Sequence, residues 1–369
     1  DHRDLHSFPT RRSSDLPLPF LFLAILGLLA ALWAGLIRLG WQLPALTPSL
    51  AMLHGPVMIS GFLGTLITLE RAVAMKQKWM YLPPLLSGLG WLIATIVPKL
   101  PFGVILLTLA SLGGVAILSE IVRREFTLHT VTMFLGAVVW LTGNLLWMFG
   151  WQIYQVVFFW MAFLVLTIAG ERLELSRVLR PSKTQQILFG GIVSVYMAGI
   201  VLTLFNLQLG TRLSGLGLLL LPLWSLRNDI AWRNVRHKLP LTRYIAWCLA
   251  LGFVWLGIGG GLSLVFGAQA AGLRYDAALH AVFVGFVISM IFGHAPIIFP
   301  AILGVPIIFQ PAFYIHLGLL HISLLLRVIA DYANLYTLRM WGGLLNEAAI
   351  ILFIGMTVLS IRKSLSAKT

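Results

Sequence analysis

The feature that most constrains the fold is a near-continuous succession of apolar runs that begins at Pro17. A helix needs roughly 20 apolar residues to cross the hydrocarbon core of a bilayer. The sequence therefore predicts an all-α integral membrane protein of about 12 transmembrane helices. The eighth of these runs is short for a span. The expected spans are Leu18–Ile37, Ser49–Leu69, Tyr81–Val97, Pro101–Leu118, Leu128–Phe149, Gln152–Gly170, Gln185–Phe205, Leu213–Leu226, Tyr244–Phe266, Asp276–Phe299, Pro311–Ile329 and Met340–Ile361.

Composition bears on what the chain contacts. Charged residues make up 10% of it, whereas a soluble domain carries roughly a quarter. The mean hydropathy is +0.93. A net charge of +14 would suit nucleic acid, but the basic residues lie in short clusters between apolar runs, where membrane proteins have their cytoplasmic loops. We therefore expect a lipid bilayer as the partner and no nucleic acid.

The single cysteine limits the chemistry. Cys248 lies inside an apolar run, which excludes an internal disulfide, a cysteine-based zinc or iron–sulfur site, and a haem attached through C-x-x-C-H.

Basic residues alternate between the two sides of the predicted bundle. Seventeen follow the C-terminal ends of the even-numbered spans and six lie on the opposite side. The positive-inside rule then places both termini in the cytoplasm, and we expect a bacterial cytoplasmic (inner) membrane. The seventeen are Arg71, Lys76, Lys78, Arg123, Arg124, Arg172, Arg177, Arg180, Lys183, Arg227, Arg233, Arg236, Lys238, Arg243, Arg362, Lys363 and Lys368. The six are Arg38, Lys99, Arg212, Arg274, Arg327 and Arg339.

The N-terminal segment resembles no native protein sequence. Residues 6–16 read HSFPTRRSSDL, which is similar to a translated sequencing-library adapter. We therefore treat residues 1–16 as non-native and exclude them from the fold. Residues 17–369 are expected to form one polytopic transmembrane domain.

Two similar motifs hint at internal repetition. Glu70–Arg71 ends the second predicted span and Glu171–Arg172 ends the sixth. Four further helices lead to the tenth span, so a pseudo-threefold arrangement of four-helix units is one interpretation. The alternative is that each motif is an ordinary helix end at the membrane interface.

Two histidines at matching depth point to a cofactor. His54 and His280 each lie about five residues into spans that run from outside to inside. Two neutral imidazoles that face one another across a bundle are the natural axial ligands of a haem iron. Gly55, Gly61 and Gly285 nearby would let a flat macrocycle approach. The alternative for each histidine is a hydrogen bond to a neighbouring helix.

The remaining ionisable groups at membrane depth give weaker indications. His294 follows His280 by 14 residues, which returns to within about 40° of the same helix face. With His321, near mid-membrane, it predicts a second site for copper or another haem. His316 points away from His321, by about 140°. His129 and His237 suit interfacial positions, and Glu347, beside Asn346, could be protonated, paired or part of a proton path.

The segments HGPVMISGF and HAVFVGFVISMIFGHAP, on predicted helices 2 and 10, resemble the haem–copper oxidase subunit I superfamily, and are closest to its divergent NnrS-type branch. In topology the resemblance covers the whole chain from Pro17. It implies three four-helix arcs and a non-covalent, b-type or related haem held by His54 and His280.

The sequence departs from the oxidases where their copper site is built. It lacks H-P-E-V-Y on helix 6, the adjacent histidine pair that follows, and H-x-H on helix 10. We therefore expect a haem protein for electron transfer, with a redox partner, or for handling nitric oxide and related diatomics, and no oxygen reduction. The alternatives are a twelve-helix secondary transporter and a scaffold subunit that binds no cofactor.

Overall fold

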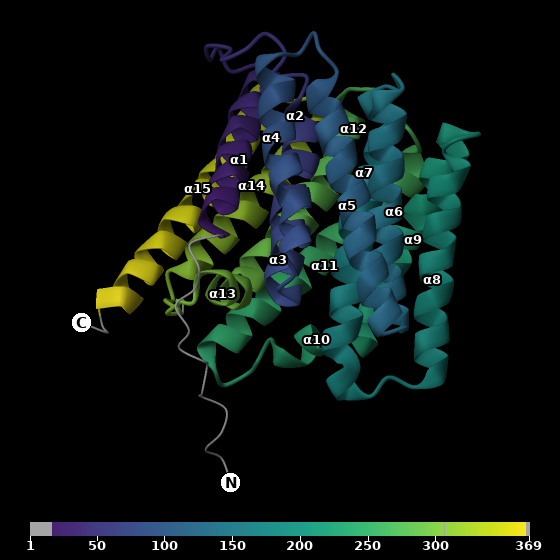
Figure 1. Ribbon diagram of the computed structural model, residues 1–369, viewed down its shortest axis with the longest axis vertical. Helices are drawn as coiled ribbons and strands as arrows, with labels where there is room; N and C mark the ends of the chain where they lie inside the picture. Colours follow the sequence, from purple (N-terminus) through teal and green to yellow (C-terminus); the bar gives the residue numbers. More distant parts are fainter. Residues whose placement is uncertain (1–16, 306, 367–369) are drawn as a thin grey trace.

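The computed structural model describes residues 17–305 and 307–366 of the chain. Every regular element in these ranges is a helix, and twelve helices are long and apolar enough to cross a membrane, judged by length and composition (Figure 1). The predicted helical class and the number of apolar spans are confirmed. The adapter-like residues 1–16 lie outside the described ranges.

Most spans are single helices, while the second, third, sixth and tenth are built from two or three consecutive segments. A short helix, α10, lies between the eighth and ninth spans. In chain order the elements are α1 (Pro17–Leu39), α2 (His54–Pro56), η1 (Val57–Leu63), α3 (Gly64–Met75), η2 (Lys78–Tyr81), α4 (Leu82–Ile96), α5 (Phe102–Arg124), α6 (Leu128–Met148), α7 (Ile153–Leu175), η3 (Ser176–Leu179), α8 (Lys183–Leu202), α9 (Leu207–Asn228), α10 (Ile230–Asn234), α11 (Pro240–Phe266), α12 (Leu273–His280), η4 (Ala281–Ile288), α13 (Ser289–Leu303), α14 (Phe313–Ala333) and α15 (Tyr336–Ser366).

Two predicted boundaries are wrong. The second span begins at His54 rather than Ser49, because the residues between them form turns in which the Leu53 N–H donates to the carbonyls of Ser49 and Leu50. The eighth span is not short, since α9 has 22 residues. Its first turn is capped by the Asn206 side chain, which accepts a hydrogen bond from the Leu209 N–H. The prediction was too short because the polar residues of α9 lower the mean hydropathy of this span.

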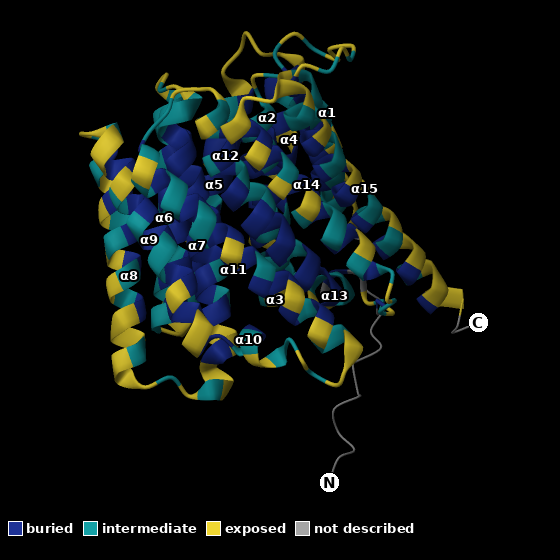
Figure 2. Cartoon of the chain, turned by 180° about the vertical axis from the view of Figure 1, so that it is seen from behind, coloured by how far each residue is buried: buried dark blue, intermediate teal, exposed yellow. Residues whose placement is uncertain are grey.

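Burial distinguishes the central spans from the peripheral ones. In the most apolar stretch of each span, 61% of residues are buried in the second, 72% in the sixth and 61% in the tenth, the highest values among the twelve. Exposed residues lie on the outer surface of the bundle (Figure 2), and many of them are large and hydrophobic, as a surface that contacts lipid requires. The second and tenth spans carry the two histidines singled out above, so the candidate ligands lie on well-buried helices.

Small residues allow the peripheral helices to pack closely. A Cβ added to Gly199 on α8 would lie 2.2 Å from the Ser214 nitrogen of α9, and one on Gly260 of α11 would lie 2.6 Å from the Leu219 nitrogen. Both contacts are to backbone, which cannot move aside. These glycines therefore fix the spacing of α8, α9 and α11, as small residues do in membrane helices in general.

Two π-helical segments interrupt the central spans. The segment η1 begins three residues after His54, and η4 begins directly after His280. Such segments are uncommon and occur frequently at functional sites. They also correct the prediction that His280 and His294 share one face. A π-helix turns each residue by less than the 100° of an α-helix, so fourteen residues that include η4 do not return to the same side.

Candidate haem site

A cavity of about 620 Å³ opens near one end of the bundle and is lined from α1, α2, η1, α7, α12, η4, α14 and α15. His54 and His280 both line it. In Figure 1 the labels α2 and α12 lie together at the upper end, opposite α10. The volume is within the range of roughly 300–1,000 Å³ that is typical of ligand sites. Two histidines 226 positions apart in the sequence therefore meet at one cavity, as predicted from their depth.

The two imidazoles lie at a separation that suits a shared metal. Their ring centres are 6.4 Å apart and their planes differ by 25°. Two imidazoles on opposite sides of one iron have ring centres roughly 6 Å apart, because metal–nitrogen bonds are about 2.0–2.1 Å long and each ring centre lies about 1 Å behind its nitrogen. The separation found here matches that requirement.

Backbone carbonyls fix the tautomer of both rings. His54 Nδ1 lies 2.7 Å from the Ala31 carbonyl oxygen, and His280 Nδ1 lies 2.9 Å from that of Asp276. A carbonyl only accepts, so each Nδ1 carries the proton and donates it. Each Nε2 therefore keeps its lone pair for a metal, and the hydrogen bond behind the ring orients it and raises its basicity.

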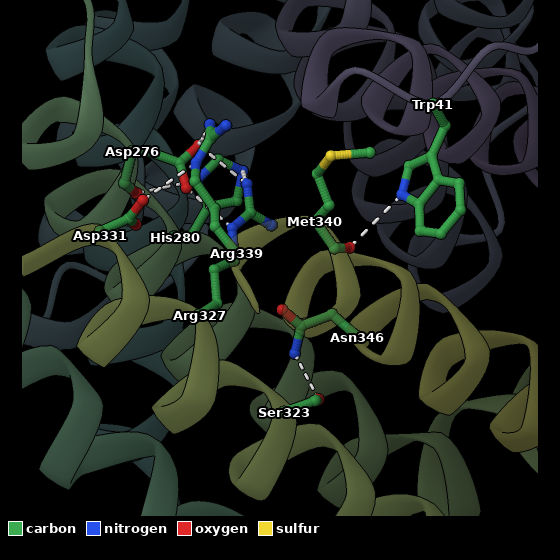
Figure 3. A network of polar contacts seen from close by, with 9 residues as sticks. All are labelled: Trp41, Asp276, His280, Ser323, Arg327, Asp331, Arg339, Met340 and Asn346. Atoms are coloured by element: carbon green, nitrogen blue, oxygen red, sulfur yellow. Dashed lines mark hydrogen bonds and ion pairs between the residues drawn. The ribbon is translucent and has the colours of Figure 1, made fainter. Parts of the chain in front are cut away.

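A buried ion-pair network adjoins His280 beside the cavity (Figure 3). Arg327 donates through Nε and Nη2 to the two carboxylate oxygens of Asp276, each at 2.8 Å. Arg339 bridges Asp276 at 3.1 Å and Asp331 at 2.9 Å. Arg327 Nη2 also lies 3.3 Å from His280 Nε2, so a metal at that nitrogen would take the place of this contact. The network offers guanidinium groups to an anionic part of a ligand.

The lining of the cavity also contains a carboxyl group and a glycine that makes room for it. Glu347 lines the cavity and makes no hydrogen bond or ion pair with another described residue. A Cβ on Gly35 would lie 3.0 Å from Glu347 Oε1 and 3.1 Å from His54 Cε1. A Cβ on Gly55 would meet nothing within 4 Å. Space beside His54 thus depends on two glycines.

The structure does not bring His294 and His321 into contact. His321 accepts a hydrogen bond at Nδ1 from Trp255 Nε1 at 2.9 Å, and its Nε2 lies 3.2 Å from Ser289 Oγ. His294 Nδ1 bonds the Met290 carbonyl at 2.7 Å, while its buried Nε2 has no partner among the described residues. No group of three or more His, Cys, Asp or Glu side chains able to hold a metal ion occurs in residues 17–305 and 307–366. A copper site there stays a prediction.

Other histidines make structural hydrogen bonds. His316 is buried, with Nε2 at 2.9 Å from the Tyr244 hydroxyl and Nδ1 near the Met356 sulfur. His129 lies 2.9 Å from the hydroxyl of Thr127, which caps α6. Both therefore fit the alternative of a polar side chain satisfied by its neighbours.

The two Glu–Arg motifs meet at the other end of the bundle. Arg71 forms an ion pair with Glu171. Arg172 donates to both carboxylate oxygens of Asp229, at 2.9 and 2.6 Å, and both side chains are buried. The motifs of the second and sixth spans thus contact one another directly, and the end of α9 joins them.

Sequence reasoning missed the ion-pair network beside His280. Arg327 was counted among the basic residues of the outer side, near the end of the predicted span Pro311–Ile329, and its side chain lies inside the bundle on α14, only 7% exposed. The usable signal was the presence of Asp276, Arg327 and Asp331 within apolar runs, since opposite charges at membrane depth pair with one another. The two π-helical segments have no comparable sequence signal.

Comparisons with known proteins identify a family without a described activity. No curated protein and no solved structure matches this chain. The family model of a domain of unknown function, DUF8744, matches residues 17–362. That match covers nearly the whole chain after the adapter-like segment and includes both cavity histidines. The chain belongs to the DUF8744 family.

Proposed function

We propose that this protein is a haem-binding integral membrane protein with a haem–copper oxidase-like, NnrS-like arrangement, whose role is electron transfer or the handling of nitric oxide and related diatomics. The observation that carries the proposal is the pair His54 and His280, which face one cavity with ring centres 6.4 Å apart. A haem bound there supplies one-electron redox chemistry.

The residues of the cavity fit this group in three respects. Each histidine is held through Nδ1, which leaves Nε2 unprotonated, and the Nε2 of His280 would exchange its contact with Arg327 for the metal. Gly55 leaves open space beside His54. Arg327 and Arg339 lie at one end of the cavity, where their guanidinium groups would bind the carboxylates that a haem carries.

Of the two roles, electron transfer suits this geometry better. His54 and His280 would both hold the iron, and a site held by two histidines would supply electron transfer rather than binding of a diatomic. The chain's own contribution is to orient the two imidazoles and to bury the site among apolar side chains, which limits access of water. A redox partner protein is part of this proposal.

The twelve-helix carrier is the second candidate function. The cavity contains the unpaired carboxyl of Glu347 as well as the guanidinium groups of Arg327 and Arg339, and such groups would also bind a polar substrate. The cavity extends to Leu63, Ile288 and Ile350, well inside their spans, so its depth also suits a carrier, which binds substrate near the midplane of the membrane. The two imidazoles, with ring centres 6.4 Å apart, favour the haem protein. Haem content separates the two candidate functions directly.

We also propose a pseudo-threefold arrangement of four-helix units in a bacterial inner membrane, with both termini in the cytoplasm. The spans at positions two, six and ten are the most buried of the twelve, which supports the arrangement. The start of α1 and the end of α15 both point toward the end of the bundle that carries α10 (Figure 1).

Reporter fusions test the orientation. The excess of Lys and Arg on one side predicts that fusions after Lys78, Arg180 and Lys238 report cytoplasm, and that fusions near Gly210 and Ala271 report the outside. A periplasmic signal after Arg180 would reverse the orientation and place the haem site at the cytoplasmic side.

Substituting Gly35 tests whether the cavity holds the cofactor. Gly35→Val would project two methyl groups toward His54 and Glu347. We expect haem affinity to fall roughly tenfold, because overpacking typically costs about 1–3 kcal/mol. The measurement is haem titration of the purified apoprotein, followed by Soret absorbance.

The matched control is Gly191→Val on α8, where an added Cβ meets nothing within 4 Å and the residue is exposed. This control introduces the same β-branched residue into a helix and should keep wild-type affinity. Equal affinity in both variants would show that haem, if bound, does not occupy this cavity.

A further inference from the structure

The stretch from the last turn of α9 to the first turn of α11 carries an uncompensated positive charge. Arg227, Arg233, Arg236, Lys238 and Arg243 lie within 17 residues and all five are exposed. None of the five makes a side-chain hydrogen bond or ion pair with another residue in the described part of the chain. We call these five residues the basic loop.

The one acidic residue of the segment does not neutralise this charge. Asp229 is only 2% exposed and accepts two hydrogen bonds from Arg172 and a third from the Ala231 N–H. Its negative charge is therefore already balanced inside the bundle. Asp229 therefore forms no ion pair with the five cations of the basic loop.

Three other exposed arginines on the same side of the bundle are compensated within the protein. Arg123 and Arg124 both pair with Glu120, at 2.6 and 2.8 Å. Arg177 pairs with Glu125 at 3.1 Å. The basic loop is thus distinguished by its concentration of unpaired cations, since it places five of them within 17 residues.

The basic loop is held close to the helix ends. Asp229 caps α10 through the Ala231 N–H, Ala231 is buried, and Trp232 Nε1 lies 3.3 Å from the Ser225 hydroxyl of α9. Figure 1 places α10 across the lower end of the bundle. Because α9 and α11 are both apolar spans, the cations between them lie at the level where lipid headgroups begin.

We propose that the basic loop is a binding surface for anionic phospholipid headgroups of the adjacent leaflet. Clusters of four to eight Lys and Arg next to a span attract anionic lipid, and arginine binds phosphate oxygens through two parallel N–H groups. A headgroup is favoured over free phosphate because the bilayer holds headgroups at a high local concentration beside these residues. This proposal is independent of the haem site.

The test compares the full chain in two kinds of nanodisc, one of phosphatidylcholine alone and one of phosphatidylcholine with phosphatidylglycerol at about 3:1. Native mass spectrometry counts the phosphatidylglycerol molecules retained on the released protein. The variant Arg233→Gln, Arg236→Gln, Lys238→Gln should bind this lipid roughly tenfold more weakly, since each cation near the surface contributes to the attraction.

A matched variant removes the same charge elsewhere on that side: Lys76→Gln, Lys78→Gln, Arg180→Gln, at exposed residues without a partner in the described chain. It should retain phosphatidylglycerol as the wild type does. Higher salt should weaken retention of phosphatidylglycerol by the wild type, because salt screens the attraction between the exposed cations and the headgroups. This measurement uses the wild type alone and therefore does not depend on how well the variants fold.

Three outcomes would overturn the proposal. The first is unchanged retention in the basic-loop variant, and the second is an equal loss in the matched variant. The third is a wild type whose thermal stability in detergent rises as much with inorganic phosphate as with phosphatidylglycerol, since that would make free phosphate the ligand.

Discussion

Replacing His54 or His280 with alanine is expected to remove the low-spin haem spectrum completely, because a six-coordinate iron needs both axial nitrogens. The two rings face one another across the cavity at 6.4 Å, and no other histidine of the described chain lines it. The measurement is the reduced-minus-oxidised absorbance of each purified variant. The losses should be non-additive, since the second substitution meets a site that is already broken.

Two further variants sharpen this test. Methionine in place of His54 can still ligate iron and should raise the reduction potential while keeping a bound haem. His129→Ala is the matched control, since His129 contacts Thr127 at the cap of α6 and does not line the cavity. A wild-type spectrum in the His54→Ala, His280→Ala double variant would reject the pair as ligands.

The largest loss of stability is expected at the opposite end of the bundle. Arg172→Met would leave Asp229 buried with a charge that nothing balances, since its carboxylate is 1% exposed and Arg172 is its ion-pair partner. Breaking a buried pair from one side costs about 3–5 kcal/mol. We expect a correspondingly lower denaturation midpoint in detergent, read from near-UV circular dichroism.

Two further variants distinguish the cost of the unbalanced Asp229 charge from the loss of an arginine side chain in general. Adding Asp229→Asn to Arg172→Met should recover much of the stability, because the remaining group is neutral and its amide oxygen can still cap α10. Arg123→Met, which removes a side chain 77% exposed from its pair with Glu120, should leave the midpoint unchanged. A midpoint for Arg172→Met equal to that of Arg123→Met would contradict this account.

Hydropathy identified the spans because lipid imposes one rule on every spanning segment: its backbone must bond internally and its surface must be apolar. Helix starts were less predictable. Ser49 to Leu53 are as apolar as the helix that follows, yet they form turns, and only their backbone hydrogen bonds distinguish them. The π-helical segments η1 and η4 were missed for the same reason, since their apolar sequences also fit an α-helix.

The candidate site was predictable in part. Depth in the bundle follows from a residue's position within its apolar run, so the sequence alone could pair two histidines at similar depth on spans that start outside. Side-chain partners were not predictable. Whether His321 offers a free nitrogen depends on Trp255 and Ser289, which reach it from other helices. The pairing of Arg327 with Asp276 likewise depends on how α14 packs against α12.

The most direct test of the central claim is the haem content of the full chain purified from haem-supplemented cells, measured by pyridine haemochrome against protein concentration. The account predicts about one non-covalent haem per chain, with a Soret band and split α and β bands on reduction, as expected of a bis-histidine site. The His54→Ala, His280→Ala variant, purified alongside, should contain none. A wild-type chain that purifies folded and free of haem, and does not take it up when titrated, would contradict the account.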